Sequence, residues 1–133
     1  MDFYGAVHDE AQQDLAGYRG AIPLRFHGSV SQHQLAEAFR THSVLVLPSL
    51  EEGFGLVIPQ ALNCGLPVIV SDRVGAKDLV RHRENGSIIP VNDPEALRAE
   101  LDFWADHPVS VEQKWDWEAP ARLLLDFSER ALR

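Results

Sequence analysis

The chain has 133 residues, of which 45% are hydrophobic and 24% are charged. This length and composition predict one globular domain over residues 1–133 and argue against a repeat array. Twenty acidic and twelve basic side chains give a formal charge of −8, which disfavours nucleic acid and anionic lipid as partners.

The lone Cys64 excludes a disulfide within the chain and a cysteine-based zinc site. We therefore expect a reduced, cytoplasmic setting. No apolar run approaches the roughly 18 residues of a transmembrane segment, and Met1 leads into Asp2 without the pattern of a signal peptide.

Short β-branched runs alternate with stretches of helical spacing along the first third of the chain. The pattern predicts strands at 2–4 and 22–26, a helix at 8–18, and a further helix that begins after Ser31 as its N-cap. Leu35, Ala38 and Phe39 have the spacing of a buried helical stripe.

The next strand is expected at 44–47, where Val-Leu-Val-Leu lacks polar alternation and is typical of a strand covered on both faces. Further strands are expected at 67–70 and 87–91, and helices at 56–63 and, in a shorter form, at 75–81.

Asp93 followed by Pro94 predicts the start of another helix, since aspartate caps a helix and proline suits its first turn. The apolar stripe of this helix would contain Leu97, Leu101 and Trp104, and a last helix is expected at 117–132. Strands that alternate with helices predict right-handed crossovers and an α/β fold, a Rossmann-like parallel sheet with flanking helices.

Ligands of open parallel sheets bind at the carboxyl ends of the strands, which draws attention to the loop that follows residues 44–47. This loop combines two carboxylates with Gly53 and Gly55, which allow the backbone to approach a ligand closely. Main-chain amides at the following helix start suit a phosphate or diphosphate, and Glu51 or Glu52 suits sugar hydroxyls. In the alternative interpretation the glycines only form a turn, Phe54 fills the core and both glutamates are solvated.

Several motifs carry a resemblance to a known family. They are PS at 48–49, EGFG at 52–55, GLPV at 65–68 and ENG at 84–86, with FHGSV at 26–30 and WDWE at 115–118. Together they resemble the nucleotide-sugar-binding, C-terminal half of retaining GT-B glycosyltransferases of family four. The resemblance covers essentially the whole chain and implies a GT-B half-domain that lacks its first strand.

By this resemblance Glu52 is the catalytic residue, which contacts the transferred sugar near the reacting centre. The substrate-binding residues it implies are Gly53, Phe54, Gly55 and Leu56, whose amides would hold sugar and diphosphate oxygens, and Gln60. It implies no metal ligand and no cofactor; the donor substrate is a nucleoside diphosphate sugar.

Gln60 departs from the family pattern, which has a second glutamate at this position to accept hydrogen bonds from both ribose hydroxyls. Glutamine offers one acceptor oxygen and no charge, and the change would cost about 1–2 kcal/mol of donor binding. The alternative is that Gln60 still bridges the ribose adequately.

The sequence also lacks the family's first strand and helix, with the Arg and Lys that neutralise the diphosphate, and its acceptor domain. The absent strand would lie between the strands at 2–4 and 44–47. These strands would then pair directly, recruit a second copy or separate chain, or stay partly unfolded.

The leading functional hypothesis is the donor-binding domain of a retaining, metal-independent hexosyltransferase with an unknown acceptor. The alternative is a non-catalytic nucleotide-sugar-binding or subunit-interaction module, which needs a separate N-terminal acceptor domain or self-association. A third hypothesis is a fragment without function.

Among single residues, His27 is expected to make local hydrogen bonds in a loop and Cys64 to be a buried thiol at a helix end. Asp72 and Asp78 flank a crossover segment and are expected to cap it, with a ligand-facing role as the alternative.

Overall fold

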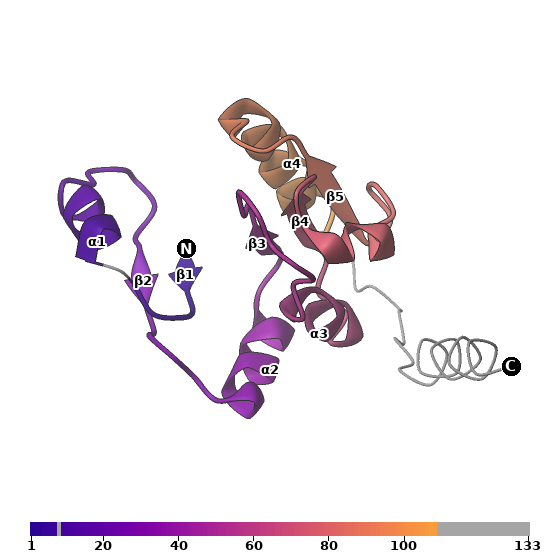
Figure 1. The fold of residues 1–133 in the computed structure, drawn as a ribbon, viewed down its shortest axis with the longest axis horizontal. Helices are drawn as coiled ribbons and strands as arrows, with labels where there is room; N and C mark the ends of the chain where they lie inside the picture. The colour runs from indigo at the N-terminus through magenta and orange to yellow at the C-terminus, as the bar shows by residue number, and fades with distance from the viewer. Residues whose placement is uncertain (8, 109–133) are drawn as a thin grey trace, which may run out of the picture. The chain divides into compact units, whose positions relative to one another are not determined.

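A computed structural model describes residues 1–7 and 9–108. The elements in chain order are β1 (Asp2–Phe3), α1 (Asp9–Ala16), β2 (Arg25–Phe26), α2 (Gln32–Thr41), β3 (Leu45–Leu47), α3 (Val57–Asn63), β4 (Val68–Ser71), the 3₁₀ helix η1 (Gly75–Leu79), β5 (Gly86–Ile89) and α4 (Pro94–Asp106) (Figure 1). The predicted alternation of strands and helices is confirmed, while the helix expected at 117–132 lies outside the described residues.

The chain divides into two compact units after Ala38. In the first unit β1 and β2 pair in parallel, and the rings of Phe3 and Phe26 stack with their centroids 4.9 Å apart. β2 is shorter than the strand expected at 22–26. Pro23 has no amide to donate to a ladder, and the pairing starts at Arg25, whose amide donates to the Met1 carbonyl (3.0 Å).

α2 begins with the cap that the sequence predicts. The Gln34 amide donates to Ser31 Oγ (3.3 Å) and the Ser31 amide donates to Gln34 Oε1 (2.9 Å), a reciprocal capping box. Phe39 from the predicted stripe is buried, and Leu35 and Ala38 are half-buried. The helix starts in the first unit and ends in the second.

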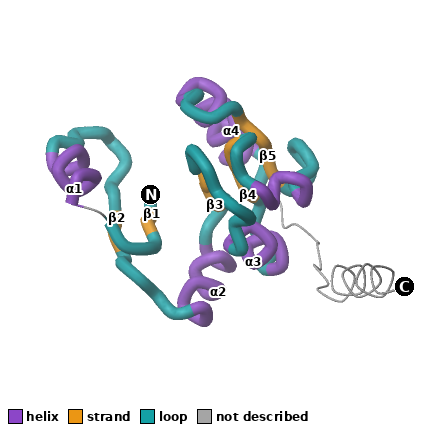
Figure 2. Tube along the Cα trace, viewed as in Figure 1, coloured by secondary structure: helices purple, strands orange, loops and turns teal. Residues whose placement is uncertain are grey.

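The second unit contains a parallel sheet in the order β3-β4-β5, with Val46 opposite Ile69 and Ile69 opposite Ser87 (Figure 2). All four residues of β4 are buried. Ile69 packs with Trp104 of α4, while α3 contacts β4 and lies on the side of the sheet opposite to α4 (Figure 1). This unit is a layered α/β structure of the predicted class.

β3 differs from the prediction, because its three residues are half-buried rather than covered on both faces. The reason is its place at the edge of the three-stranded sheet. β1 belongs to the first unit and β3 to the second, and the direct pairing considered from the sequence stays an expectation.

α4 begins where the sequence predicts. The Asp93 carboxylate accepts a hydrogen bond from the Ala96 amide (2.8 Å), and Pro94 occupies the first turn. Trp104 is buried and Leu97 and Leu101 are half-buried, which confirms the predicted apolar stripe. Over the ranges 1–7 and 9–108, no helix combines the length and apolar character that crossing a membrane requires.

Candidate functional site

The loop between β3 and α3 is held by hydrogen bonds to the segment that follows β4. The Glu52 amide donates to the Arg73 carbonyl (3.2 Å), the Gly75 amide donates to the Glu52 carbonyl (3.1 Å), and the Ala76 amide donates to the Phe54 carbonyl (2.8 Å). Two segments that leave neighbouring parallel strands at their carboxyl ends are thus joined into one surface.

Two glycines permit this close approach. A Cβ atom at Gly75 would overlap the Gly53 carbonyl oxygen, so a side chain there is incompatible with the crossing. Gly55 has φ +81° and is surrounded by Val74, Ile58 and Leu47, at 3.1 to 3.3 Å from a Cβ built on it. This left-handed backbone conformation favours glycine at position 55, while the predicted approach of a ligand to Gly55 stays a prediction.

The predicted site residues 52–56 lie together in this loop. In the part of the chain that the structure describes, the amides of Gly53, Phe54, Gly55 and Leu56 have no hydrogen-bond acceptor. Adjacent amides without acceptors, next to a helix start, form a place where an anion can bind.

The side chains of the loop do not follow the turn-only interpretation. Phe54 is 40% exposed and therefore does not fill the core. Glu51 is exposed, whereas Glu52 is half-buried, and its carboxylate forms no hydrogen bond or ion pair with any described residue. Gln60 is half-buried and lies one helical turn after Leu56, so both occupy the same face of α3.

Further contacts tie the carboxyl ends of all three strands together. Ser71 Oγ donates to the Ser49 carbonyl (2.5 Å), and the Val91 amide donates to Asp72 Oδ1 (3.2 Å). Lys77 Nζ donates to the Asp72 carbonyl (2.7 Å). The capping role expected for Asp72 is wrong, because its carboxylate binds the chain after β5 instead; no side chain caps η1.

A cavity of about 370 Å³ opens at the same end of the sheet. The residues that line it follow β3, β4 and β5 or begin α4: Pro48, Ser71, Ile89, Pro90, Val91, Asn92, Asp93, Pro94 and Leu97. This cavity and the loop both lie at the carboxyl ends of the strands, where ligands of parallel sheets bind.

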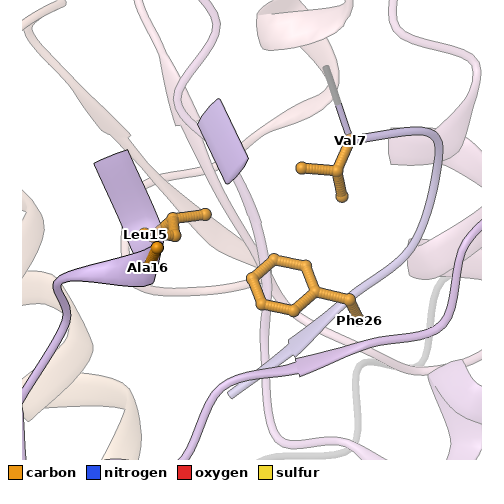
Figure 3. Close-up of a pocket in the computed structure, with 4 residues that line it drawn as sticks. All are labelled: Val7, Leu15, Ala16 and Phe26. Carbon is orange, nitrogen blue, oxygen red and sulfur yellow. The ribbon is translucent and has the colours of Figure 1, made fainter. Parts of the chain in front are cut away.

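The first unit has a separate hollow of about 350 Å³, lined by Val7, Leu15, Ala16 and Phe26 (Figure 3). These four described lining residues are all apolar. His27, expected to make local bonds, forms a hydrogen bond with Asp2 Oδ1 (2.7 Å) and stacks on Tyr4, which confirms that prediction.

Two other predicted residues have ordinary surroundings. Cys64 lies at the end of α3 as predicted but is half-buried rather than buried. Asp78 is exposed on η1. Within residues 1–7 and 9–108, no group of three or more His, Cys, Asp and Glu side chains is arranged to hold a metal ion.

A buried polar network under β5 was not predicted. Glu100 accepts hydrogen bonds from Arg83 Nη2 (2.9 Å) and Ser87 Oγ (2.6 Å), and Trp104 Nε1 donates to the same Ser87 oxygen (3.0 Å). Burial raises the pKa of Glu100, but the hydrogen bonds from Arg83 and Ser87 and the charges of Arg83 and His82 together leave it below its ordinary value. One feature of the sequence could have indicated this network: Glu100 is a charged residue that lies at helical spacing between the apolar residues Leu97 and Trp104.

Comparison with known proteins gives one consistent result. Residues 6–122 match the family described as "Glycosyl transferases group 1". A D-inositol 3-phosphate glycosyltransferase of Streptomyces griseus is 36% identical over 96% of this chain and 29% of its own length. The enzyme of the same name from Streptomyces scabiei is 40% identical over 78% of this chain and 24% of its own length.

Solved structures agree with this match. Sucrose-phosphate synthase from Thermosynechococcus elongatus superimposes with a TM-score of 0.77 at 26% identity, over 91% of this chain and 33% of that protein. Anabaena HepE in complex with UDP superimposes with a TM-score of 0.71 at 20% identity, over 83% of this chain and 32% of that protein, which shows a common fold. The chain thus spans about a third of the length of the proteins it resembles.

Proposed function

The chain belongs to the group 1 glycosyl transferases, and from this premise we propose that it is the donor-binding part of a hexosyltransferase. In this proposal the chain acts as one nucleotide-sugar-binding domain over residues 1–133. The donor is a nucleoside diphosphate sugar, and the hexose passes to an acceptor hydroxyl with retention of configuration and without a metal ion.

One observation supports this proposal: in the same loop, four adjacent main-chain amides and the half-buried carboxylate of Glu52 have no hydrogen-bond partner among the described residues. Amides suit the oxygens of a diphosphate, which are anionic, and a carboxylate suits the hydroxyls of a sugar, which are donors. Along the chain the carboxylate of Glu52 comes directly before the four amides. Anabaena HepE, which has been solved in complex with UDP and with UDP-glucose, supports the same class of ligand.

We assign the residues of the site as follows. Glu52 is the catalytic residue and contacts the hexose that is transferred. The amides of Gly53, Phe54, Gly55 and Leu56 bind sugar and diphosphate oxygens. Gln60 accepts a single neutral hydrogen bond from the ribose, which is weaker than the bonds a carboxylate would accept.

A second candidate function is a binding or subunit-interaction module that is not catalytic by itself. The observation that favours it is the length of the match, since the chain spans about a third of the relatives. In this version a further segment or a partner chain supplies the acceptor site. The cytoplasm is the proposed location in both versions, on the ground of the lone Cys64.

Calorimetric titration with UDP, ADP and GDP and their glucose conjugates tests the proposal. We expect one nucleotide to bind and its sugar conjugate to bind more tightly. Glu52→Ala should remove the preference for the conjugate and leave the affinity for the nucleotide largely unchanged, because only the hexose contacts this carboxylate.

Glu51→Ala is the matched control, since Glu51 is the exposed neighbour with the same charge. It should retain the preference for the sugar conjugate. A Glu52→Ala protein that still prefers the conjugate would show that Glu52 has been given the wrong role. Binding without hydrolysis or transfer favours the module, and transfer that appears only when a second polypeptide is added favours an enzyme completed by a partner.

A further inference from the structure

The last residue of β4 is a serine in an otherwise apolar strand. Val68, Ile69 and Val70 precede Ser71, and all four residues are fully buried. Burial of a hydroxyl is costly unless the hydroxyl forms hydrogen bonds. The partners of Ser71 therefore show what this side chain holds in place.

Ser71 Oγ has two partners, and both lead to the loop that carries Glu52. The hydroxyl donates to the Ser49 carbonyl (2.5 Å), shortly before Glu52 in the chain. The same oxygen accepts a hydrogen bond from the Arg73 amide (3.4 Å), and the Arg73 carbonyl accepts one from the Glu52 amide (3.2 Å). The hydroxyl is thus connected to Glu52 both along the loop and through the peptide groups of Arg73.

The bond from Ser71 holds a stretch of chain that no other hydrogen bond fixes. The ladder between β3 and β4 ends at the pair Leu47 and Val70. In the described part of the chain, the Ser71 bond is the one hydrogen bond that residues 48–51 form before the backbone bonds of Glu52 begin. The path of the loop from the end of β3 to Glu52 therefore depends on one buried hydroxyl.

Side-chain packing does not replace this bond. Pro48, Leu50 and Glu51 are exposed, and the cavity of about 370 Å³ borders both Pro48 and Ser71. Without the hydroxyl, the loop can move while the core of β4 stays in place. A displacement of about 1 Å at a reacting group can cost about 100-fold in rate, so a bond that fixes the approach to Glu52 bears on function.

We propose that Ser71 is a positioning residue of the donor site, whose buried hydroxyl sets where the Glu52 carboxylate meets the hexose. This inference rests on the proposed function and adds a residue that acts on the sugar through the loop. The diphosphate end of the loop depends less on Ser71, because the Phe54 carbonyl is held separately by the Ala76 amide (2.8 Å).

Ser71→Ala tests the proposal by removing the hydroxyl alone. Calorimetry of the full chain uses whichever of UDP, ADP and GDP binds, together with its glucose conjugate. The preference for the conjugate should fall about fivefold, the equivalent of one hydrogen bond, while the affinity for the nucleoside diphosphate changes less than about twofold. Ser71→Cys keeps a weaker donor of similar size, should lose less of the preference, and carries the test if the alanine variant does not fold.

Ser87→Ala is the matched control. Ser87 is also a fully buried serine, in the neighbouring strand β5, and its hydroxyl donates to Glu100 Oε2 (2.6 Å) instead of to the loop. This variant loses the same kind of hydrogen bond and should melt at a lower temperature. It should nevertheless retain the preference for the sugar conjugate, whereas a preference that followed stability alone would fall in both variants.

Two further measurements establish whether Ser71 acts through Glu52. Hydrogen exchange of the Glu52 amide should accelerate more in Ser71→Ala than that of the Ile69 amide in the core of β4. In a Glu52→Ala background, Ser71→Ala should have no further effect on the preference, because the carboxylate that Ser71 positions is gone.

A Ser71→Ala protein that keeps the full preference, while Glu52→Ala loses it, would overturn the role of Ser71 and leave the proposed function standing. An equal loss of preference in Ser87→Ala, or a loss that persists in the Glu52→Ala background, would also overturn it. If none of the probes binds the unchanged chain, the proposed function is overturned and this inference with it.

Discussion

Replacement of Gly75 by alanine tests how closely the loop after β3 crosses η1. A Cβ at this position would overlap the Gly53 carbonyl oxygen, which belongs to backbone and cannot rotate away. The two segments must separate, and the hydrogen bonds from the amides of Gly75 and Ala76 to the loop, 3.1 and 2.8 Å long, are strained or lost.

The expected cost has two parts. Forcing an extra carbon into a packed contact costs about 1–3 kcal/mol, and each hydrogen bond contributes about 1 kcal/mol. Gly75→Ala should therefore lower the free energy of unfolding by about 3 kcal/mol. With a urea m value of about 1–3 kcal/mol per molar, the midpoint of unfolding should fall by about 1–3 M.

Urea titration followed by circular dichroism measures this loss, and hydrogen exchange of the amides of residue 75 and Ala76 locates it. Gly53→Ala is the matched control, because a Cβ at Gly53 meets no atom within 4 Å. It should change the free energy of unfolding by less than about 1 kcal/mol. An unchanged midpoint together with unchanged protection of both amides in Gly75→Ala would refute the close crossing.

Two further predictions concern Glu100 and Gln60. Glu100→Gln should cost about 2 kcal/mol at pH 7, since the charge-assisted bonds from Arg83 and Ser87 are weakened. Folding lowers the pKa of Glu100, so this stabilisation is complete above the unfolded pKa of about 4.3 and disappears as the pH falls through the folded pKa. Urea titration of the unchanged protein and of Glu100→Gln at several pH values measures this change. A difference between their unfolding midpoints that stays constant down to pH 2 would contradict the prediction. Gln60→Glu should strengthen the binding of the preferred nucleoside diphosphate by about 1–2 kcal/mol, as measured by calorimetry. The gain should be smaller for the corresponding 2′-deoxy nucleotide. An equal gain for both nucleotides would show that residue 60 does not contact the ribose.

The sequence was a good guide wherever a signal is local. The fully apolar run of β4 and the Asp93-Pro94 start of α4 appear where they were expected, because strand burial and helix capping depend on residues that are close in the chain. The rule for parallel sheets and the glycines place the candidate site in the loop after β3, and its role in binding stays a prediction.

Features that depend on distant residues were not predictable. The fixing of the loop by residues 73–76 joins segments about 20 positions apart, and Glu100 meets Ser87 across 13 positions. The exposure of β3 follows from its place at the sheet edge, which its own apolar sequence does not reveal.

Under the proposed function, the hydrogen bonds between the loop and η1 also bear on how donor preference could change. Because Glu52 and Phe54 share backbone bonds with Gly75 and Ala76, a substitution in either segment displaces the other. Libraries that aim to redirect this protein toward another sugar should therefore vary residues 73–77 together with 50–56. Screens limited to groups that touch the hexose would leave half of this coupled surface unexplored.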